Sequence, residues 1–247
     1  MPLLALLEIA IQGFCAYHAI QTGRTSPWLY IVALPGVGPM AYVLFVLLPD
    51  MAQTRRGRKV LVNVQDVLDP DGQYRERRKQ VELTGTPANK AALADECSRK
   101  GMHDEAVELY RSALIGFYAD DPNLLLGFAR VLMEKGDFAE AQHTLDHLRE
   151  KNPDFQSPDG HLLYARSLEG QGKRDEAIKE YEALIGYFAG HEAKVRYALF
   201  HQKLGNPGKA REILEGVVKK HRDLPYHARE LNHEWYDVAR RVLAGKA

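Results

Sequence analysis

The amino-acid sequence predicts an all-α protein, in which an apolar N-terminal helical hairpin is followed by a solenoid of helix hairpins. Three observations lead to this prediction. The first 50 of the 247 residues carry only three charged side chains, which are Glu8, Arg24 and Asp50. A glycine-centred pattern recurs from position 101 onward at spacings of 35, 36 and 33 residues. Capping residues followed by proline mark several helix starts.

The charges of the whole chain balance, with 33 Lys and Arg residues against 33 Asp and Glu residues. This composition excludes a strongly basic nucleic-acid-binding protein and an acidic disordered chain. The two cysteines, Cys15 and Cys97, lie in very different sequence surroundings, which excludes a disulfide scaffold. The sequence therefore predicts no nucleic-acid partner.

Residues 1–50 predict a transmembrane helical hairpin that serves as a membrane anchor. The run from Trp28 to Leu48 holds 21 residues without a charge, and a helix needs about 20 residues to cross a bilayer. The segment before it, from Met1 to Ile20, is apolar apart from Glu8, Gln12 and His18. A buried helix pair in a soluble protein is the alternative, but the length of the uncharged run favours a membrane.

Four residues interrupt the middle of the second apolar run, namely Pro35, Gly36, Gly38 and Pro39. Proline removes a backbone donor and clashes with the preceding turn, so the helix is expected to kink or break here. Two arrangements stay open for this anchor, a kinked span and a re-entrant hairpin.

Residues 51–69 are expected to form a basic linker, because Arg55, Arg56, Arg58 and Lys59 directly follow the apolar segment. Short basic flanks stay on the cytoplasmic side of a membrane. The sequence therefore predicts a location in the bacterial inner membrane, with the rest of the chain in the cytoplasm. A solvated basic linker is the alternative, and it is compatible with the same orientation.

The apolar segment, with WLYIVALPGVGPMAY after a short polar turn, resembles the N-terminal membrane segment of cardiolipin synthases and related phospholipase D proteins. The resemblance implies phospholipid chemistry that uses a His, a Lys and an Asp five residues beyond the Lys. The nearest match is His201-Gln202-Lys203, where Gly208 stands at the Asp position. The resemblance is therefore limited to the role of an accessory subunit of a phospholipid-metabolism enzyme.

A repeating unit of two amphipathic helices begins near residue 87 and occurs four times. Each unit has a glycine between its helices, a small alanine in the first helix and a large apolar residue in the second. Glycine ends a helix in the left-handed conformation, and alanine lets two helices approach closely. The glycines are Gly101, Gly136, Gly172 and Gly205, the alanines are Ala94, Ala129, Ala165 and Ala198, and the large residues are Tyr110, Leu145, Tyr181 and Leu214.

Helix starts within this region are marked by Thr86-Pro87, Asp121-Pro122 and Ser157-Pro158. The units resemble tetratricopeptide repeats over residues 87–221, which implies an α-solenoid of about four helix hairpins. Helices are also expected at residues 70–86 and 222–247. They would cap the two ends, because a solenoid needs terminal covers for its last apolar faces.

No set of side chains in the sequence predicts a catalytic site, a metal site or a cofactor. His143 and His147 lie four residues apart on one helical face, which suits metal ligation, but no third ligand accompanies them. The sequence therefore predicts a non-enzymatic protein.

The first helices of the units are expected to line a concave groove whose side chains select the ligand. Two units carry an aromatic-Ala-Arg triplet, which places Arg130 and Arg166 at equivalent positions. Arginine favours the carboxylate and backbone oxygens of an extended peptide. The alternative is that each Arg pairs with an acidic residue of its own helix. The candidate groove residues are Arg130, Glu134, Arg166, Glu169, Gln202 and Lys203.

These observations together predict a membrane-anchored tetratricopeptide-repeat scaffold that binds a protein or peptide partner at the cytoplasmic face of the inner membrane. The alternative is the accessory role beside a phospholipid-metabolism enzyme. Assembly into a homo-oligomer, through the solenoid ends and Trp235, is a further alternative.

Overall fold

The computed structural model describes residues 2–23, 28–47, 49 and 69–245. The regular elements of these residues are all helical, which confirms the all-α prediction. The chain divides into two units, residues 1–73 and 74–247, and each unit has its own hydrophobic core.

The N-terminal unit contains α1 (Pro2–Gln21), α2 (Trp28–Val32), α3 (Val37–Tyr42) and a π-helical turn, η1 (Val43–Leu47). Its core is small. Tyr42 lies at its centre, with its hydroxyl 3.0 Å from His18 Nδ1 and its ring 5.4 Å from that of Trp28 in an edge-to-face contact. The buried core residues are Cys15, Ala19, Val32, Tyr42 and Val46.

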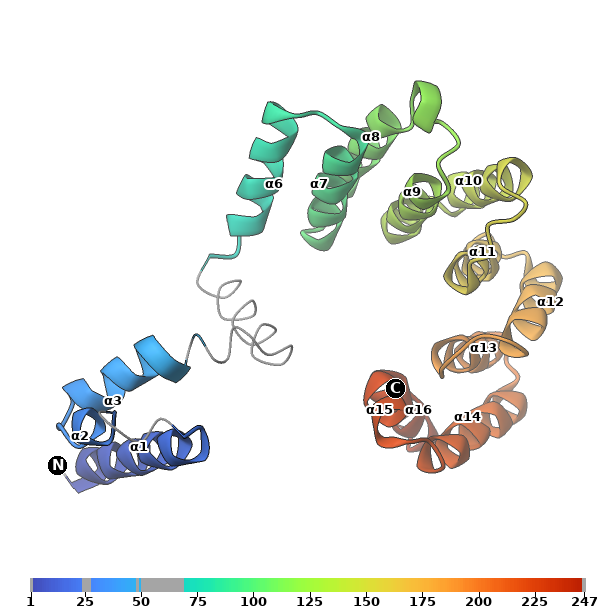
Figure 1. Ribbon diagram of the computed structural model, residues 1–247. Helices are drawn as coiled ribbons and strands as arrows, with labels where there is room; N and C mark the ends of the chain where they lie inside the picture. The colour runs from blue at the N-terminus through green and yellow to red at the C-terminus, as the bar shows by residue number, and fades with distance from the viewer. Residues whose placement is uncertain (1, 24–27, 48, 50–68, 246–247) are drawn as a thin grey trace. The chain divides into compact units, whose positions relative to one another are not determined.

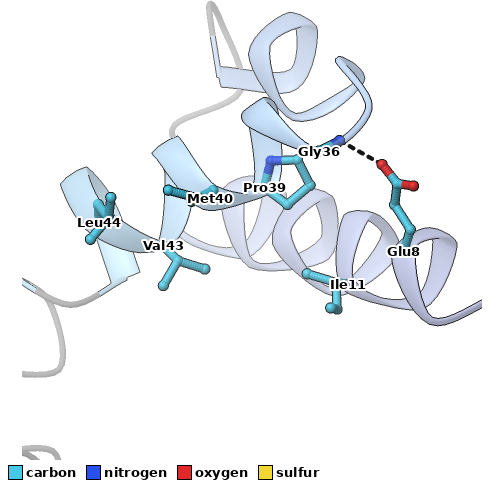
Figure 2. A pocket seen from close by; sticks show the side chains of 7 residues that line it. All are labelled: Glu8, Ile11, Gly36, Pro39, Met40, Val43 and Leu44. Atoms are coloured by element: carbon cyan, nitrogen blue, oxygen red, sulfur yellow. Dashed lines mark hydrogen bonds between the residues drawn. The ribbon is translucent and has the colours of Figure 1, made fainter. Parts of the chain in front are cut away.

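The second apolar run breaks between α2 and α3, at Pro35 and Gly36. Gly36 has a φ of 75°, a left-handed conformation that favours glycine, and it precedes α3. Its N–H donates to Glu8 Oε1 of α1 over 2.5 Å, as Figure 2 shows. Gly38 packs so closely against the carbonyl of Ile31 that a β-carbon would overlap it. Gly36 and Gly38 therefore allow the backbone to adopt this break, and the Glu8 carboxylate stabilises it.

The prediction of a transmembrane hairpin is wrong, because no helix within the described residues is both long and apolar enough to cross a membrane. The run from Trp28 to Leu47 forms three short elements of 5, 6 and 5 residues in place of one long helix. The physical reason is the Pro35–Gly36 break, which interrupts the helix before it reaches the required length. The basic residues Arg55, Arg56, Arg58 and Lys59 lie outside the described residues.

The C-terminal unit contains consecutive helices joined by short turns. Four pairs make up its body, and single helices precede and follow them. In chain order the elements are α6 (Gly72–Leu83), α7 (Pro87–Arg99), α8 (His103–Ala113), a 3-10 turn η2 (Gly116–Tyr118), α9 (Pro122–Lys135), α10 (Phe138–Lys151), α11 (Pro158–Gly170), α12 (Arg174–Ile185), α13 (Glu192–Lys203), α14 (Pro207–Arg222), α15 (Tyr226–Leu231) and α16 (His233–Leu243).

The pairs are α7–α8, α9–α10, α11–α12 and α13–α14, and each pair also packs against the next. Figure 1 shows that the pairs follow an arc within this unit, with α9, α11 and α13 on its inner side and α10 and α12 on its outer side. This arrangement is the predicted solenoid of helix hairpins.

The four aligned glycines have the conformation that the repeat requires. Their φ values are 76°, 89°, 73° and 77° at Gly101, Gly136, Gly172 and Gly205. The four alanines of the first helices are 0% exposed, so each first helix approaches its neighbours closely at this point. The large residues of the second helices, Tyr110, Leu145, Tyr181 and Leu214, are buried as well.

Side-chain caps begin three of the first helices, as the sequence predicts. Thr86 accepts a hydrogen bond from the N–H of Asn89, Asp121 from that of Leu124, and Ser157 from that of Gly160. Each cap satisfies one of the free N–H groups in the first turn of a helix.

The solenoid ends are covered unequally. At the front, α6 contributes Tyr74 and Val81 to the first core and has no buried residue of its own. At the back, the segment expected as one capping helix forms α15 and α16, which meet at Asn232. The α16 side chains of Trp235, Val238 and Val242 pack on the last hairpin.

Candidate partner-binding groove

The predicted groove residues all lie on first helices, but the structure brings only half of them together. Arg166 and Glu169 of α11 and Lys203 of α13 line one cavity of about 400 Å³. Arg130 and Glu134 lie one repeat earlier, on α9. Gln202 lines a different cavity, beside the end of α16.

The cavity has an apolar floor and a cationic rim. Arg174 and Arg196 join Arg166 and Lys203 at the rim, and Glu169 is the acidic residue among the described residues that line the cavity. The floor comes from four apolar side chains, those of Met133, Phe138, Phe200 and Leu204. We call this cavity the groove pocket.

The floor depends on a close contact between neighbouring repeats. Phe138, the first residue of α10, lies directly against the backbone of Gly170 at the end of α11, where a β-carbon would overlap its ring. Gly170 therefore allows the ring to reach the pocket, and any larger residue would have to displace it.

Glu169 is held by two partners from different helices. Its Oε1 lies 2.7 Å from Lys203 Nζ, and its Oε2 accepts a hydrogen bond from the Tyr181 hydroxyl over 2.9 Å. Burial and the negative charge of Glu169 raise the pKa of Tyr181, so this hydroxyl stays protonated and donates. Both carboxylate oxygens are thereby engaged within the protein.

Arg166 has no carboxylate within 4.0 Å in the part of the chain that the structure describes. It is half-buried, and both burial and the neighbouring charge of Arg196 lower its pKa. A guanidinium in this setting stays charged at neutral pH but is poorly compensated. It therefore gains from an incoming anion more than a solvated arginine would.

Arg196 lines the groove pocket and also contacts α16, the helix that covers the C-terminal end of the solenoid. Its Nε lies 2.7 Å from Glu192 Oε1, and its guanidinium lies 4.6 Å from the ring centroid of Trp235 on α16. These two contacts, an ion pair and a cation–π contact, hold the guanidinium at the rim.

The alternative in which Arg130 and Arg166 each pair with an acidic residue of their own helix is not found among the described residues. Glu169 pairs with Lys203, and Glu134 instead accepts a hydrogen bond from Ser98 Oγ of α7. Arg130 is exposed and has no ion-pair partner within 4.0 Å in residues 69–245.

Sequence reasoning missed Arg196, Arg174 and the floor residues. Arg130 and Arg166 lie six residues before their repeat glycines, whereas Arg196 lies nine residues before Gly205. Arg196 therefore occupies no position that recurs between repeats, and the repeat alignment did not identify it. Arg166 and Arg196 line the same pocket because α11 and α13 belong to consecutive hairpins and both lie on the inner side of the arc (Figure 1).

The His-Lys match to phospholipase D chemistry does not form an exposed site. His201 is 7% exposed, and its ring packs 4.5 Å from that of Tyr197. Burial lowers the pKa of His201.

The matches to family models lie in the C-terminal unit. Two family models described as tetratricopeptide repeat match residues 99–167 and 162–227. No curated protein sequence matches the chain. The comparisons give no support for a cardiolipin-synthase-like segment at the N-terminus, since both family matches begin after residue 98.

Three solved structures share the fold. A thermophilic tetratricopeptide-repeat protein of Thermus thermophilus has a TM-score of 0.55 at 14% identity and covers 73% of this chain and 95% of its own. A MamA RS-1 double mutant has a TM-score of 0.54 at 12% identity, covering 67% and 93%. Yeast Tom70 has a TM-score of 0.50 at 17% identity, covering 89% of this chain and 48% of its own.

These likenesses show the fold, and the family models match the region that holds the four repeat glycines and three of the four alanines. Tetratricopeptide repeats are protein-interaction scaffolds and are typically non-catalytic. Residues 99–227 of this chain are tetratricopeptide repeats.

Proposed function

We propose that this chain is a non-catalytic adaptor whose solenoid binds an acidic peptide segment of a partner protein in the groove pocket. The observation that carries the proposal is the half-buried Arg166, which faces a second guanidinium, that of Arg196, and has no carboxylate of its own among the described residues. Four cations line the pocket with one acid, Glu169, and Glu169 is already held by Lys203 and Tyr181.

The chemistry of the pocket favours an extended peptide with one carboxylate beside an apolar side chain. The guanidinium fork of Arg166 suits a carboxylate, and the floor of Phe138 and Phe200 suits the neighbouring apolar group. Hydrogen bonds to a charged group contribute about 1.5–3 kcal/mol. Arg130, one repeat away, would contact a more distant part of the same peptide.

The test is a crosslinking pull-down with the full chain and single variants. Arg166→Ala is expected to lose the partner, because it removes the uncompensated cation, and Arg130→Ala is expected to weaken capture less. Arg222→Ala, an exposed arginine at the end of α14, is the matched control and should bind as the native chain does. Equal capture by the native chain and Arg166→Ala would contradict the proposal.

We also propose that the adaptor acts at the cytoplasmic face of the bacterial inner membrane. The support is the scarcity of charge in residues 1–50 and the exposure of apolar side chains in the N-terminal unit. Phe14, Tyr30 and Met40 are 56%, 78% and 66% exposed, and Met40 lines an open apolar cleft with Ile11 and Leu44 (Figure 2). Cell fractionation with a reporter at Ala247 tests the location, and recovery in the soluble fraction would contradict it.

No contact in the described residues and no family match favours the accessory role beside a phospholipid-metabolism enzyme. Self-assembly is tested separately by light scattering of the full chain. A mass that stays monomeric as concentration rises would count against a homo-oligomer.

A further inference from the structure

A second cavity lies at the opposite end of α11 from the groove pocket. It has a volume of about 670 Å³ and is bounded by the end of α10, the segment before α11, the first turns of α11 and Tyr187 after α12. Leu145, Leu148 and Phe155 give it apolar walls, and the rings of Tyr164 and Tyr187 complete them. Its size and mixed lining are those of small-ligand sites.

One wall of this cavity is held by a chain of hydrogen bonds. His161 Nε2 lies 2.6 Å from Glu180 Oε2, and His161 Nδ1 is hydrogen-bonded to the Tyr187 hydroxyl. A neutral ring with its proton on Nε2 satisfies both partners, since it donates to the carboxylate and accepts from the phenol. The Tyr187 ring is thus fixed in place although its side chain is 56% exposed.

A cation without a carboxylate partner lies at the mouth of the cavity. The Arg149 guanidinium carbon is 5.0 Å from the ring centroid of Tyr164, and no acidic side chain lies within 4.0 Å of its nitrogens in the described chain. Asp146, three residues earlier on α10, accepts a hydrogen bond from the Gln142 amide over 3.5 Å. Stacking on Tyr164 orients the guanidinium while leaving its N–H groups available.

We propose that this cavity, the aromatic pocket (Leu145, Leu148, Arg149, Phe155, His161, Tyr164 and Tyr187), binds a ligand with an aromatic or branched apolar body and a carboxylate head. The walls enclose the body, and Arg149 binds the head at the mouth. Two sources provide this chemistry, a free arylalkyl carboxylate and the C-terminal residue of a peptide. The site is separate from the groove pocket, because His161 and Glu169 lie about 12 Å apart along α11.

The test compares ligands that differ only in charge. The full chain is titrated calorimetrically with 3-phenylpropionate and with 3-phenylpropionamide, and the acid is expected to bind about tenfold more tightly. The peptide Ala-Ala-Ala-Phe with a free C-terminus and its C-terminal amide provide the second comparison. Preference for the acid in the small compounds alone indicates a free carboxylate ligand, and preference in the peptides alone indicates a partner's C-terminus.

Single variants test whether these compounds bind in the aromatic pocket. Arg149→Gln is expected to remove the preference for the acid while the amide still binds, because the apolar walls are unchanged. Tyr187→Phe keeps the ring but loses the bond to His161, so both compounds should bind several-fold more weakly. Arg222→Gln, at the exposed end of α14, is the matched control and should bind like the native chain, and Arg166→Gln reports any binding of the same compounds in the groove pocket.

The proposal is overturned if neither acid binds at millimolar concentration, if acid and amide bind the native chain equally, or if Arg149→Gln keeps the preference. An effect of Arg166→Gln equal to that of Arg149→Gln would also overturn it, since binding would then belong to the groove pocket. Loss of partner capture by the groove variants has no bearing on these outcomes, so the two proposals fail separately.

Discussion

Single residues determine where the helices of each repeat end, and the glycines show this most clearly. Gly136 has a φ of 89° and Gly216 lies inside α14, and a β-carbon on either one would meet no atom within 4 Å. The two positions therefore differ in backbone conformation and not in available space. The repeat alignment predicted the special role of Gly136, because it repeats, and gave none to Gly216, because it does not.

We predict opposite effects for the same substitution at these two positions. Gly136→Ala should lower the free energy of unfolding by about 1–2 kcal/mol, because a left-handed conformation is unfavourable for alanine. Gly216→Ala should raise it by about 0.5–1 kcal/mol, because alanine favours the interior of an exposed helix. Urea unfolding of the full chain measures both, and a loss of stability in Gly216→Ala would contradict the distinction.

Individual arginines were harder to predict than individual glycines. Arg166 follows from a repeated triplet, but Arg196 reaches the groove pocket from a position that no other repeat shares. The rim of a pocket depends on the lateral distance between neighbouring helices, which repeat spacing does not specify. The sequence therefore predicted three of the groove-pocket residues, Arg166, Glu169 and Lys203, and missed the rest.

The helices of the repeats begin where the sequence predicts, whereas the second apolar run, expected as a kinked or broken membrane helix, forms three short elements. Caps and prolines mark where α7, α9 and α11 begin, and these signals act locally. Hydropathy alone cannot tell one long apolar helix from three short ones. The break at Gly36 is stabilised by Glu8 on another helix, 28 positions away in the sequence, and such a contact cannot be predicted from a local pattern.

A buried pair of histidines lies where the last hairpin, α13–α14, contacts α15 and α16. His191 Nε2 lies 3.2 Å from His221 Nδ1, and the His221 ring stacks on Tyr236 of α16 at 3.9 Å. Burial, His221, Lys194 and Lys220 together lower the pKa of His191 to about 4. His221 faces Arg229, His233 and Asp237 from α15 and α16, and burial lowers its pKa as well.

We predict that acid destabilises the packing around this histidine pair. Because the pKa of His191 is about 4 in the folded protein, below the ordinary histidine value of 6.5, the unfolded chain binds the proton first as pH falls. The free energy of unfolding should therefore fall as pH drops from about 6.5 to about 4 and change little above that range. Urea unfolding over this range tests it, and His191→Gln should reduce the slope. An equal slope in the variant would assign the effect to other groups.

In the whole solenoid, each hairpin is stabilised by its contacts with the adjacent hairpins. Each hairpin packs mainly on the adjacent ones, and α16 covers the last core, where Val195, Leu214 and Val217 are buried. Such arrays behave as a sum of repeat and interface terms.

We predict that removing α16, by a stop at His233, loosens the C-terminal end and spares the front. Amide hydrogen exchange should become faster in α13 and α14, because their apolar side chains lose their cover, and stay nearly unchanged in α7 to α10. Exchange mass spectrometry of the full and shortened chains measures this. Uniform acceleration along the solenoid would show that it unfolds as one cooperative block.

The contact between Arg196 and Trp235 provides an optical reporter of the groove pocket. The chain has two tryptophans, and Trp235 lies 4.6 Å from a guanidinium that lines the pocket. An anion that draws Arg196 toward itself changes the field at the indole ring, so its emission maximum and intensity should shift on binding. A Trp28→Phe chain would make this signal specific, and the partner's affinity could then be measured in solution without a label.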